Sequence, residues 1–308
     1  MALPRDGDRQ VIDFHVHVGP EVLARRYDVI TLADEAARAG FGCVLKHHSI
    51  PTTPLAALAR NRGVVMAGGV VLNRWVGGFN PHAVDALAEA NKAQVGARRE
   101  DHVRSVVWMP TAHAESHLRL NGRRDFVPAW GVDPARVREH PPGTGLSIWE
   151  GGPDEPGPLR PEVRAVLDRI AAHDLVLATG HLSRLEVLAL VEAAVSVGVR
   201  RIVVTHAFYQ ANNLTIDDQV QLATFPGVCL EYCWSNVHFD AIPLERYVDA
   251  IRAVGPEHAL LSSDLGQPST ETVAAGLSAF YQALVARGIP EDHVAEAMIA
   301  NPHRLLGL

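Results

Sequence analysis

Four histidines and one aspartate stand at or next to the ends of apolar runs in the sequence. They are His15, His17, His181, His206 and Asp264. In an extended strand, residues two positions apart point to the same side, so His15 and His17 can face one centre. Imidazole and carboxylate are typical ligands of Zn²⁺ and of related cations such as Mn²⁺ and Fe²⁺. The set therefore predicts a divalent-metal site, with Zn²⁺ as the first choice.

The apolar runs alternate with amphipathic segments along the whole chain. This alternation predicts βα units around a parallel sheet whose strands are buried on both faces. We count eight candidate strands: Val11–Val18, Gly42–His48, Val64–Leu72, Arg104–Met109, Leu175–Thr179, Arg201–His206, Val228–Cys233 and Ala259–Asp264. Helices are expected at Thr31–Ala39, Pro81–Gln94, Pro161–Ala172, Arg184–Val197, Leu244–Val254 and Glu271–Arg287.

Eight strands with interleaved helices favour a (β/α)₈ TIM barrel that forms one domain over residues 1–308. An open, doubly wound sheet is the alternative, but its first strand is usually followed by a glycine-rich phosphate turn, where this chain has His-x-His. One segment is unusually long: residues 111–160 are rich in Pro, Gly, His and Arg. This composition predicts a long βα loop after strand 4, over the mouth of the barrel.

The order His-x-His, His, His and Asp, spread over strands 1, 5, 6 and 8, resembles that of the amidohydrolase superfamily of metal-dependent hydrolases. The resemblance covers essentially the whole chain. It implies that His15, His17 and Asp264 hold a first metal and that His181 and His206 hold a second one or contact substrate. It also implies that Asp264 moves a proton between water and the leaving group, with His206 as a further catalytic residue. The expected reaction is hydrolysis of an amide, cyclic imide, lactam or ester bond in a small molecule.

The chain departs from the family pattern at the position that bridges two metals. Superfamily members bridge them with a carboxylated lysine or a glutamate, most often from strand 4, and residues 106–111 contain neither. Lys46, near the end of strand 2, is the substitute that we expect. A lysine inside a barrel must be paired, neutralised or bound to metal, and carbamylation by CO₂ would turn it into an anionic bridge. The alternatives are an ammonium that binds substrate, or a one-metal site with Glu150 or no residue in that position.

Polar residues near the ends of other strands are candidates for contacting substrate. His48 is preferred over His47 because it has the same strand parity as Lys46. Two histidines four apart on a helix can bind zinc, but the glutamate between His113 and His117 is not in the metalloprotease position, so we interpret both as substrate contacts. The remaining candidates are Arg74, which suits a substrate carboxylate, and Glu231.

Other histidines fall in loops or on helices, and we expect surface or helix-capping roles for them. These are His82, His102, His140, His173, His258, His293 and His303. For Asp13, which precedes the histidine pair on the first strand, we expect a side chain that faces the helices, in a structural role or hydrogen-bonded behind the ligands.

The composition limits the classes of partner. A net charge of −7 argues against nucleic-acid binding, and we expect no signal peptide and no membrane span, because residues 1–10 are short and charged and no apolar run is long enough for a bilayer. We expect a cytoplasmic protein with a small-molecule substrate and no membrane partner, and a homo-oligomer stays open. The three cysteines lie in apolar runs, which predicts buried thiols without disulfides. Two other functions stay open: a single-metal, non-oxidative decarboxylase of the same superfamily, and a metal-free barrel that binds or scaffolds.

Overall fold

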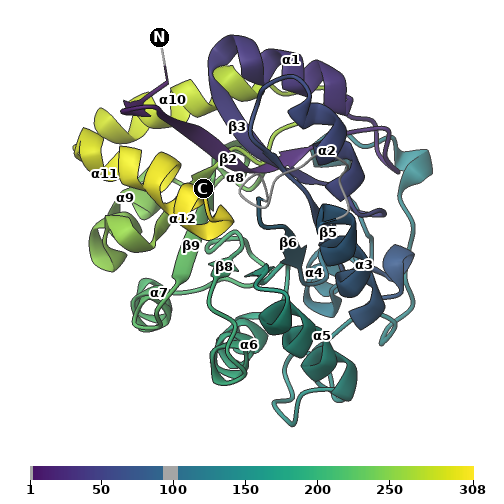
Figure 1. Ribbon diagram of the computed structural model, residues 1–308. Coiled ribbons are helices and arrows are strands. Elements are labelled where there is room, and N and C mark those ends of the chain that lie inside the picture. The colour runs from purple at the N-terminus through teal and green to yellow at the C-terminus, as the bar shows by residue number, and fades with distance from the viewer. Residues whose placement is uncertain (1–2, 93–102) are drawn as a thin grey trace.

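The computed structural model describes residues 3–92 and 103–308, and it places parallel strands at the centre with helices around them (Figure 1). Every predicted strand segment contains at least one strand. The strands are β2 (Arg9–His17), β3 (Phe41–Lys46), β4 (Met66–Ala67), β5 (Gly69–Val71), β6 (Val106–Trp108), β7 (Val176–Ala178), β8 (Ile202–Val204), β9 (Val228–Cys233) and β10 (Ala259–Ser262). A short β1 (Arg5–Asp6), which the apolar pattern does not predict, pairs antiparallel with β2.

The strands close into a barrel. Parallel pairing runs from β2 through β3 to β4 and from β5 through β9 to β10, and only Gly68 separates β4 from β5. The ring is completed by a parallel bridge between Val16 and Leu265. Asp264 N donates to His15 O at 2.9 Å, and His17 N donates to Leu265 O at 2.8 Å. The predicted TIM-barrel fold is therefore confirmed, and its closure brings the first and last strands side by side.

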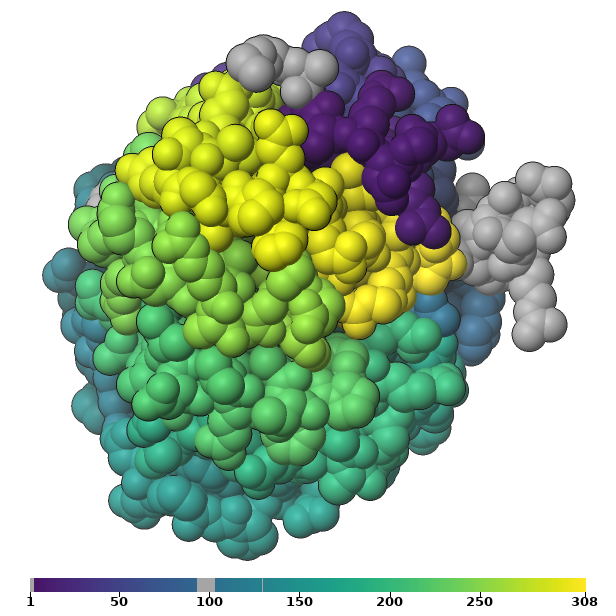
Figure 2. Space-filling view, turned by 90° about the vertical axis from the view of Figure 1, so that its left-hand side faces the viewer, coloured from purple at the N-terminus to yellow at the C-terminus, as the bar shows by residue number. Residues whose placement is uncertain are grey.

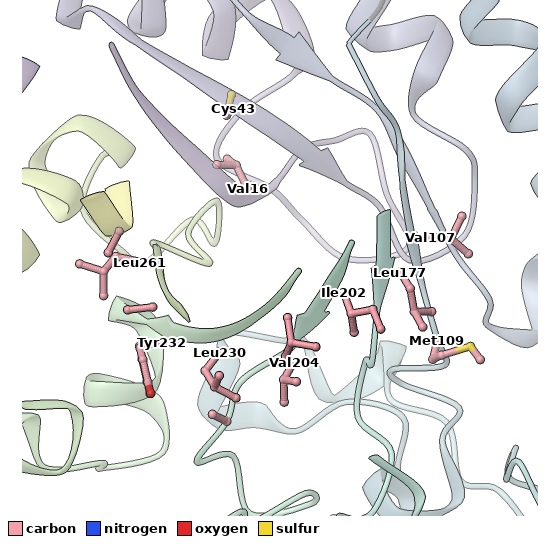
Figure 3. Packing of buried hydrophobic residues seen from close by; sticks show 14 of the residues in the cluster. Val16, Cys43, Val107, Met109, Leu177, Ile202, Val204, Leu230, Tyr232 and Leu261 are labelled. Atoms are coloured by element: carbon pink, nitrogen blue, oxygen red, sulfur yellow. The ribbon is translucent and has the colours of Figure 1, made fainter. Parts of the chain in front are cut away.

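The strand side chains form two apolar layers. One layer draws residues from strands all around the barrel, among them Phe14, Val44, Trp108 and Leu260, and α12 adds Leu305 and Leu306 to it. This layer fills the barrel interior. The alternate strand residues pack against the surrounding helices, and Figure 3 shows part of that outer layer, with Val204 and Leu230 on neighbouring strands.

A one-residue irregularity in β2 decides where its polar residues point. Asp13 pairs with Cys43, but Val16 pairs with Leu45, so the register shifts by one residue between them. A bulge of this kind puts one extra residue on a strand and changes its alternation. Phe14 lies in the interior layer and Val16 in the outer one, so that His15, between them, can join His17 on the inner side.

The helices are α1 (Val29–Ala39), α2 (Thr53–Arg60), α3 (Pro81–Lys92), α4 (Glu115–Leu120), α5 (Pro161–Ala172), α6 (Arg184–Ser196), α7 (Ile216–Ala223), α8 (Trp234–Phe239), α9 (Leu244–Val254), α10 (Val273–Val285), α11 (Glu291–Ala295) and α12 (Asn301–Leu306). The six predicted helices are found within about two residues at each end, except that the predicted residues 93 and 94 of the second lie outside the described part of the chain. The sequence patterns did not predict α2, α7 or the short helices. None of the helices in residues 3–92 and 103–308 has the length and apolar character needed to cross a bilayer.

The two ends of the chain meet on one side of the barrel. Figure 2 shows the last helices, in yellow, beside the first residues, in purple. His303 on α12 lies with its Nε2 3.0 Å from Gln10 O on β2. It is buried, so the surface role expected for His303 is wrong. The three cysteines are buried and free, as predicted.

Candidate metal centre

His15 and His17 point at the same oxygen atom. The Nε2 atom of each ring lies 3.1 Å from Asp264 Oδ1, and all three side chains are largely buried. Their ligand atoms lie within 4.8 Å of one another. Asp264 follows β10 in a left-handed conformation with φ of 53°, and Ser235 Oγ donates to its Oδ2 at 2.7 Å. The carboxylate is thus fixed by the backbone and by a hydroxyl, which orients it toward the two imidazoles.

Glu231 on β9 determines how His15 carries its proton. Glu231 Oε1 lies 3.3 Å from His15 Nδ1, and both side chains are buried. A carboxylate in this place keeps the imidazole proton on Nδ1 and leaves a lone pair on Nε2. That lone pair then faces both the Asp264 carboxylate and the Lys46 amine, so Nε2 is the ring atom that is available to a cation. The donor set therefore fits a divalent cation held by His15, His17 and Asp264.

His17 is also contacted by Arg25, a residue that the sequence patterns did not single out. Arg25 Nη2 lies 3.1 Å from His17 Nδ1 and 3.2 Å from His48 Nδ1. The buried Glu21 balances this charge through an ion pair with Arg25 and accepts a 2.5 Å hydrogen bond from the backbone N of His48. Metal binding through His17 Nε2 would move the ring proton to Nδ1, so Arg25 would have to turn away from it.

Lys46 reaches the same centre from β3. Its Nζ lies 2.8 Å from His15 Nε2 and 5.6 Å from the centre of the Trp108 ring. The side chain is buried, and this burial lowers the pKa of the amine, against the opposing effect of Asp264 and Glu231. Glu150, in contrast, is exposed and pairs with Arg160 at 2.8 Å. Lys46 thus contacts a residue of the centre, whereas Glu150 is exposed and paired with Arg160.

His206 lies beside His15, with the ring centres 5.0 Å apart, and His181 lies beside His206. The ring centres of His181 and His206 lie 5.4 Å apart, and His206 Nε2 is 3.9 Å from Asp264 Oδ2. Burial lowers the pKa of His206 to about 4, and its buried Nδ1 has no hydrogen-bond partner among the described residues. His181 Nδ1 lies 3.0 Å from His117 Nδ1. Among the described residues, His181 belongs to no group of three close ligands.

A pocket opens above these residues. Lys46, His181, His206 and Asp264 all line it. The loop after β6 contributes a wall made of Trp130, Gly131 and Val132. Asn236 Nδ2, also in the lining, donates a 2.6 Å hydrogen bond to Asp240 Oδ2, and burial raises the pKa of Asp240 to about 6. Sequence reasoning missed Arg25, Asn236 and Asp240, because they lie in segments without a recognisable motif.

Of the five predicted substrate contacts, only His48 lines the pocket, where its ring stacks on His17 with the centres 4.8 Å apart. Arg74 is exposed and donates to the carbonyl oxygen of Thr144. Glu231 lies behind His15.

The other two candidates, His113 and His117, also lie away from the pocket. His117 lies behind His181 and contacts Asp125 O at 2.8 Å. His113 precedes α4 and packs its ring against Trp75. Arg74, Glu231, His113 and His117 therefore do not line this pocket, and their contact with substrate stays a prediction. Glu231 is on β9 and faces His15, whereas Arg74, His113 and His117 lie beyond the ends of their strands, where strand parity no longer fixes the path of the chain.

The predictions for Asp13 and for the histidines expected at the surface agree with the structure only in part. Asp13 is buried, and its Oδ1 accepts hydrogen bonds from His15 N at 3.2 Å and Ser263 N at 2.9 Å, so it ties β2 to the end of β10. Burial raises its pKa to about 7. His82 is exposed as expected, whereas His140 is partly buried beside Asp125. His102 lies outside the described residues.

Solved structures share the fold of this chain. A triple mutant of an organophosphorus hydrolase from Deinococcus radiodurans is 13% identical, with a TM-score of 0.57 over 100% of this chain and 98% of that chain. An amidohydrolase from Pseudomonas aeruginosa is 10% identical, with a TM-score of 0.56 over 98% of both chains. A protein engineered for organophosphate hydrolysis from a weak promiscuous lactonase is 14% identical, with a TM-score of 0.56 over 97% of this chain and 95% of that chain. The chain thus has the fold of the amidohydrolase superfamily, as the order of its ligands predicted.

At the level of sequence, no curated protein matches the chain significantly. One family model does match, over residues 10–231, and it is described as a family of unknown function, DUF6282. The matched range includes four of the five convergent residues and Lys46, and it ends at Glu231. The chain therefore belongs to the DUF6282 family, and it shares the fold of the similar solved structures.

Proposed function

We propose that this protein is a metal-dependent hydrolase that cleaves an amide, cyclic imide, lactam or ester bond of a small molecule. The observation that carries the proposal is the convergence of His15 Nε2 and His17 Nε2 on Asp264 Oδ1, at 3.1 Å each, at the floor of a pocket. The similar solved structures include proteins named as an organophosphorus hydrolase and an amidohydrolase, which supports the same class of reaction.

His15, His17 and Asp264 would hold a divalent cation, for which Zn²⁺ is our first choice. When bound, such a cation polarises a carbonyl and lowers the pKa of water, so that hydrolysis proceeds at neutral pH. Asp264 accepts the proton of the attacking water and returns it to the leaving group. Ser235, whose Oγ donates to Asp264 Oδ2 at 2.7 Å, holds the carboxylate in place during both transfers.

Lys46 is proposed to carry a carbamate. To form it, Nζ bonds to the carbon of CO₂ and releases a proton. The bridging role is supported by the contact of Nζ with His15 Nε2 at 2.8 Å and by the presence of Lys46, His181 and His206 in the lining of one pocket. A second cation would then be held by Lys46, His181 and His206. The bridging role and the second cation are proposals, as are the small-molecule substrate and the cytoplasmic location expected from composition.

The pocket walls indicate what the substrate presents. Arg25, His48 and Lys46 line one part of the pocket, and Leu23, Trp130 and Val132 add apolar surface. We propose that a polar or anionic group of the substrate faces Arg25 and His48 and that an apolar part lies against Trp130. Binding by a few polar groups on apolar walls is usual for small-molecule pockets.

Metal analysis joined to an activity screen tests the proposal. The wild type and His15→Ala/His17→Ala are purified, loaded with Zn²⁺, Mn²⁺ or Fe²⁺, and measured for bound metal and for acid release from panels of esters, lactones, amides and cyclic imides. We expect the double variant to lose at least one equivalent of metal together with the hydrolytic activity. His82→Ala, on an exposed surface, is the control.

Three results would overturn the proposal. The first is a wild type that cannot be loaded with metal, and the second is hydrolysis that persists in the double variant. The third is release of CO₂ from carboxylic acid substrates by a protein with a single cation and no hydrolytic activity, which would identify the decarboxylase alternative.

A further inference from the structure

A second group of metal-type ligands lies in the long loop after β6, outside the pocket. His113 comes from the segment between β6 and α4, whereas Asp125 and His140 lie on two backbone segments that pair antiparallel. His140 N donates to Arg123 O at 2.8 Å, and Asp125 N donates to Arg138 O at 3.2 Å. The ligand atoms of the three side chains lie within 4.8 Å of one another.

The contact between His140 and Asp125 has the length of a ligand pair rather than that of a hydrogen bond. His140 Nε2 lies 3.5 Å from Asp125 Oδ2, and this buried nitrogen has no hydrogen-bond partner among the described residues. An N–H···O bond is usually about 2.9 Å long. Two ligands of a tetrahedral zinc, with bonds of about 2.0–2.1 Å, lie about 3.4 Å apart.

The surroundings favour a cation in this place. Asp125 is buried, and its Oδ1 accepts hydrogen bonds from Phe126 N at 3.0 Å and Arg138 N at 2.8 Å, which leaves Oδ2 toward the histidines. His113 is buried and meets the His140 ring edge-on at 5.0 Å. Its Nδ1 accepts a hydrogen bond from Arg74 N at 3.4 Å.

This group lies next to the part of the loop that forms the pocket wall. Phe126 and Val132 pack in one apolar cluster with Leu23, and Trp75 packs against it. The same loop also places Trp130, Gly131 and Val132 at the pocket. We propose that His113, Asp125 and His140 form a structural Zn²⁺ site that fastens the loop segment 123–140 to the end of the barrel. The site does not take part in the reaction and does not depend on the proposed function.

Metal counting together with tryptic cleavage tests this site. Zn²⁺ content is measured after dialysis for the wild type, His140→Ala, Asp125→Asn and the barrel variant His15→Ala/His17→Ala. Asp125→Asn keeps an Oδ1 acceptor for Phe126 N and Arg138 N, so it removes the charge and preserves the shape. His173→Ala is the matched control, because His173 forms an ordinary 2.9 Å contact with Asp85 and has no third ligand close by among the described residues.

We expect His140→Ala and Asp125→Asn to bind one Zn²⁺ fewer per chain than the wild type and the control. The loop contains Arg124, Arg136 and Arg138, all exposed, which are trypsin sites. Cleavage there should accelerate at least tenfold in these variants, and in the wild type after a chelator. It should stay slow in the zinc-loaded barrel variant, which separates this site from the barrel site.

Two results would refute the site. One is an unchanged Zn²⁺ count in both folded variants, which would leave His140 and Asp125 as a simple ion pair. The other is loop cleavage in the wild type at the same rate with and without Zn²⁺, a measurement that needs no variant.

Discussion

Glu231 on β9 lies directly behind His15 on β2, with its Oε1 3.3 Å from the Nδ1 atom of the ring. The two residues are 216 positions apart in the sequence, and both are buried. This contact fixes the tautomer of His15, so it sets which nitrogen is free for a cation. Residues that orient a metal ligand from behind usually affect affinity by about 10- to 100-fold.

Glu231→Gln should therefore weaken metal binding by about tenfold, and Glu231→Ala by more. The glutamine keeps an oxygen that can accept the Nδ1 proton but loses the negative charge. Titration of apo protein against a chromophoric chelator measures the affinity. Equal affinity in the wild type and both variants would remove Glu231 from the metal centre.

Lys46→Ala should lose hydrolytic activity, and short carboxylates such as acetate should restore part of it. The space left by the side chain can admit a free carboxylate, which then takes the place of the carbamate. Lys46→Arg separates the two roles considered for this residue, because arginine keeps a positive charge but forms no carbamate. Activity retained in Lys46→Arg, with no effect of acetate on Lys46→Ala, would identify Lys46 as a cation that binds substrate.

Asp264→Asn should lower kcat by about 10²- to 10⁴-fold, the usual contribution of a positioned acid or base. His15 and His17 remain in the variant, so it should keep a substantial part of its metal. Both quantities are measured on the same sample. Near-normal turnover would mean that another group moves the proton, and Asp240 in the pocket would be the next residue to test.

Asp218→Asn should destabilise the fold in a pH-dependent way. Asp218 accepts hydrogen bonds from Arg184 Nε and Nη2 at 2.6 Å each and from Thr215 Oγ1 at 2.7 Å. These contacts lower its pKa from 3.8 to about 2, with Arg184 as the main cause. The shift corresponds to about 2 kcal/mol, and the exposure of Arg184 reduces this to about 1 kcal/mol.

The sign of this dependence follows from the lowered pKa. Stability from Asp218 is fully present above its unfolded pKa of about 4 and is lost as the pH falls toward about 2. The difference in unfolding free energy between wild type and variant, measured in urea, should therefore shrink between pH 6 and pH 3. A difference that is the same at both pH values would contradict the ion-pair explanation.

Gly180→Ala should be more destabilising than Gly198→Ala, by about 1–3 kcal/mol. Both glycines have positive φ, at 61° and 90°, so alanine is strained at either position. At Gly180 an added Cβ would also collide with the carbonyl oxygens of Met109 and Pro110, whereas at Gly198 it would meet open space. Thermal and urea unfolding measure the difference. Equal losses would mean that backbone strain alone matters and that the chain around His181 can shift.

The sequence by itself determined the parts of this protein that depend on local pattern. Strand positions follow from apolar runs, and the ends of β2, β7, β8 and β10 place their polar residues at one end of the barrel, because all these strands run parallel. Strand parity selected His48 over His47, and His48 lines the pocket. The alternation of strands and helices was therefore enough to predict the barrel, and the polar residues at the strand ends were enough to predict the convergence of His15, His17 and Asp264.

The tertiary structure decided everything that depends on contacts between distant segments. Closure of the ring through Val16 and Leu265 brings Asp264 to the first strand, and the bulge in β2 lets His15 follow Phe14 toward the interior. Because of the paths of their loops, Arg74, His113 and His117 lie away from the pocket, whereas Arg25 lines it. Such paths are set by packing among residues far apart in the chain, and no periodicity in the sequence encodes them.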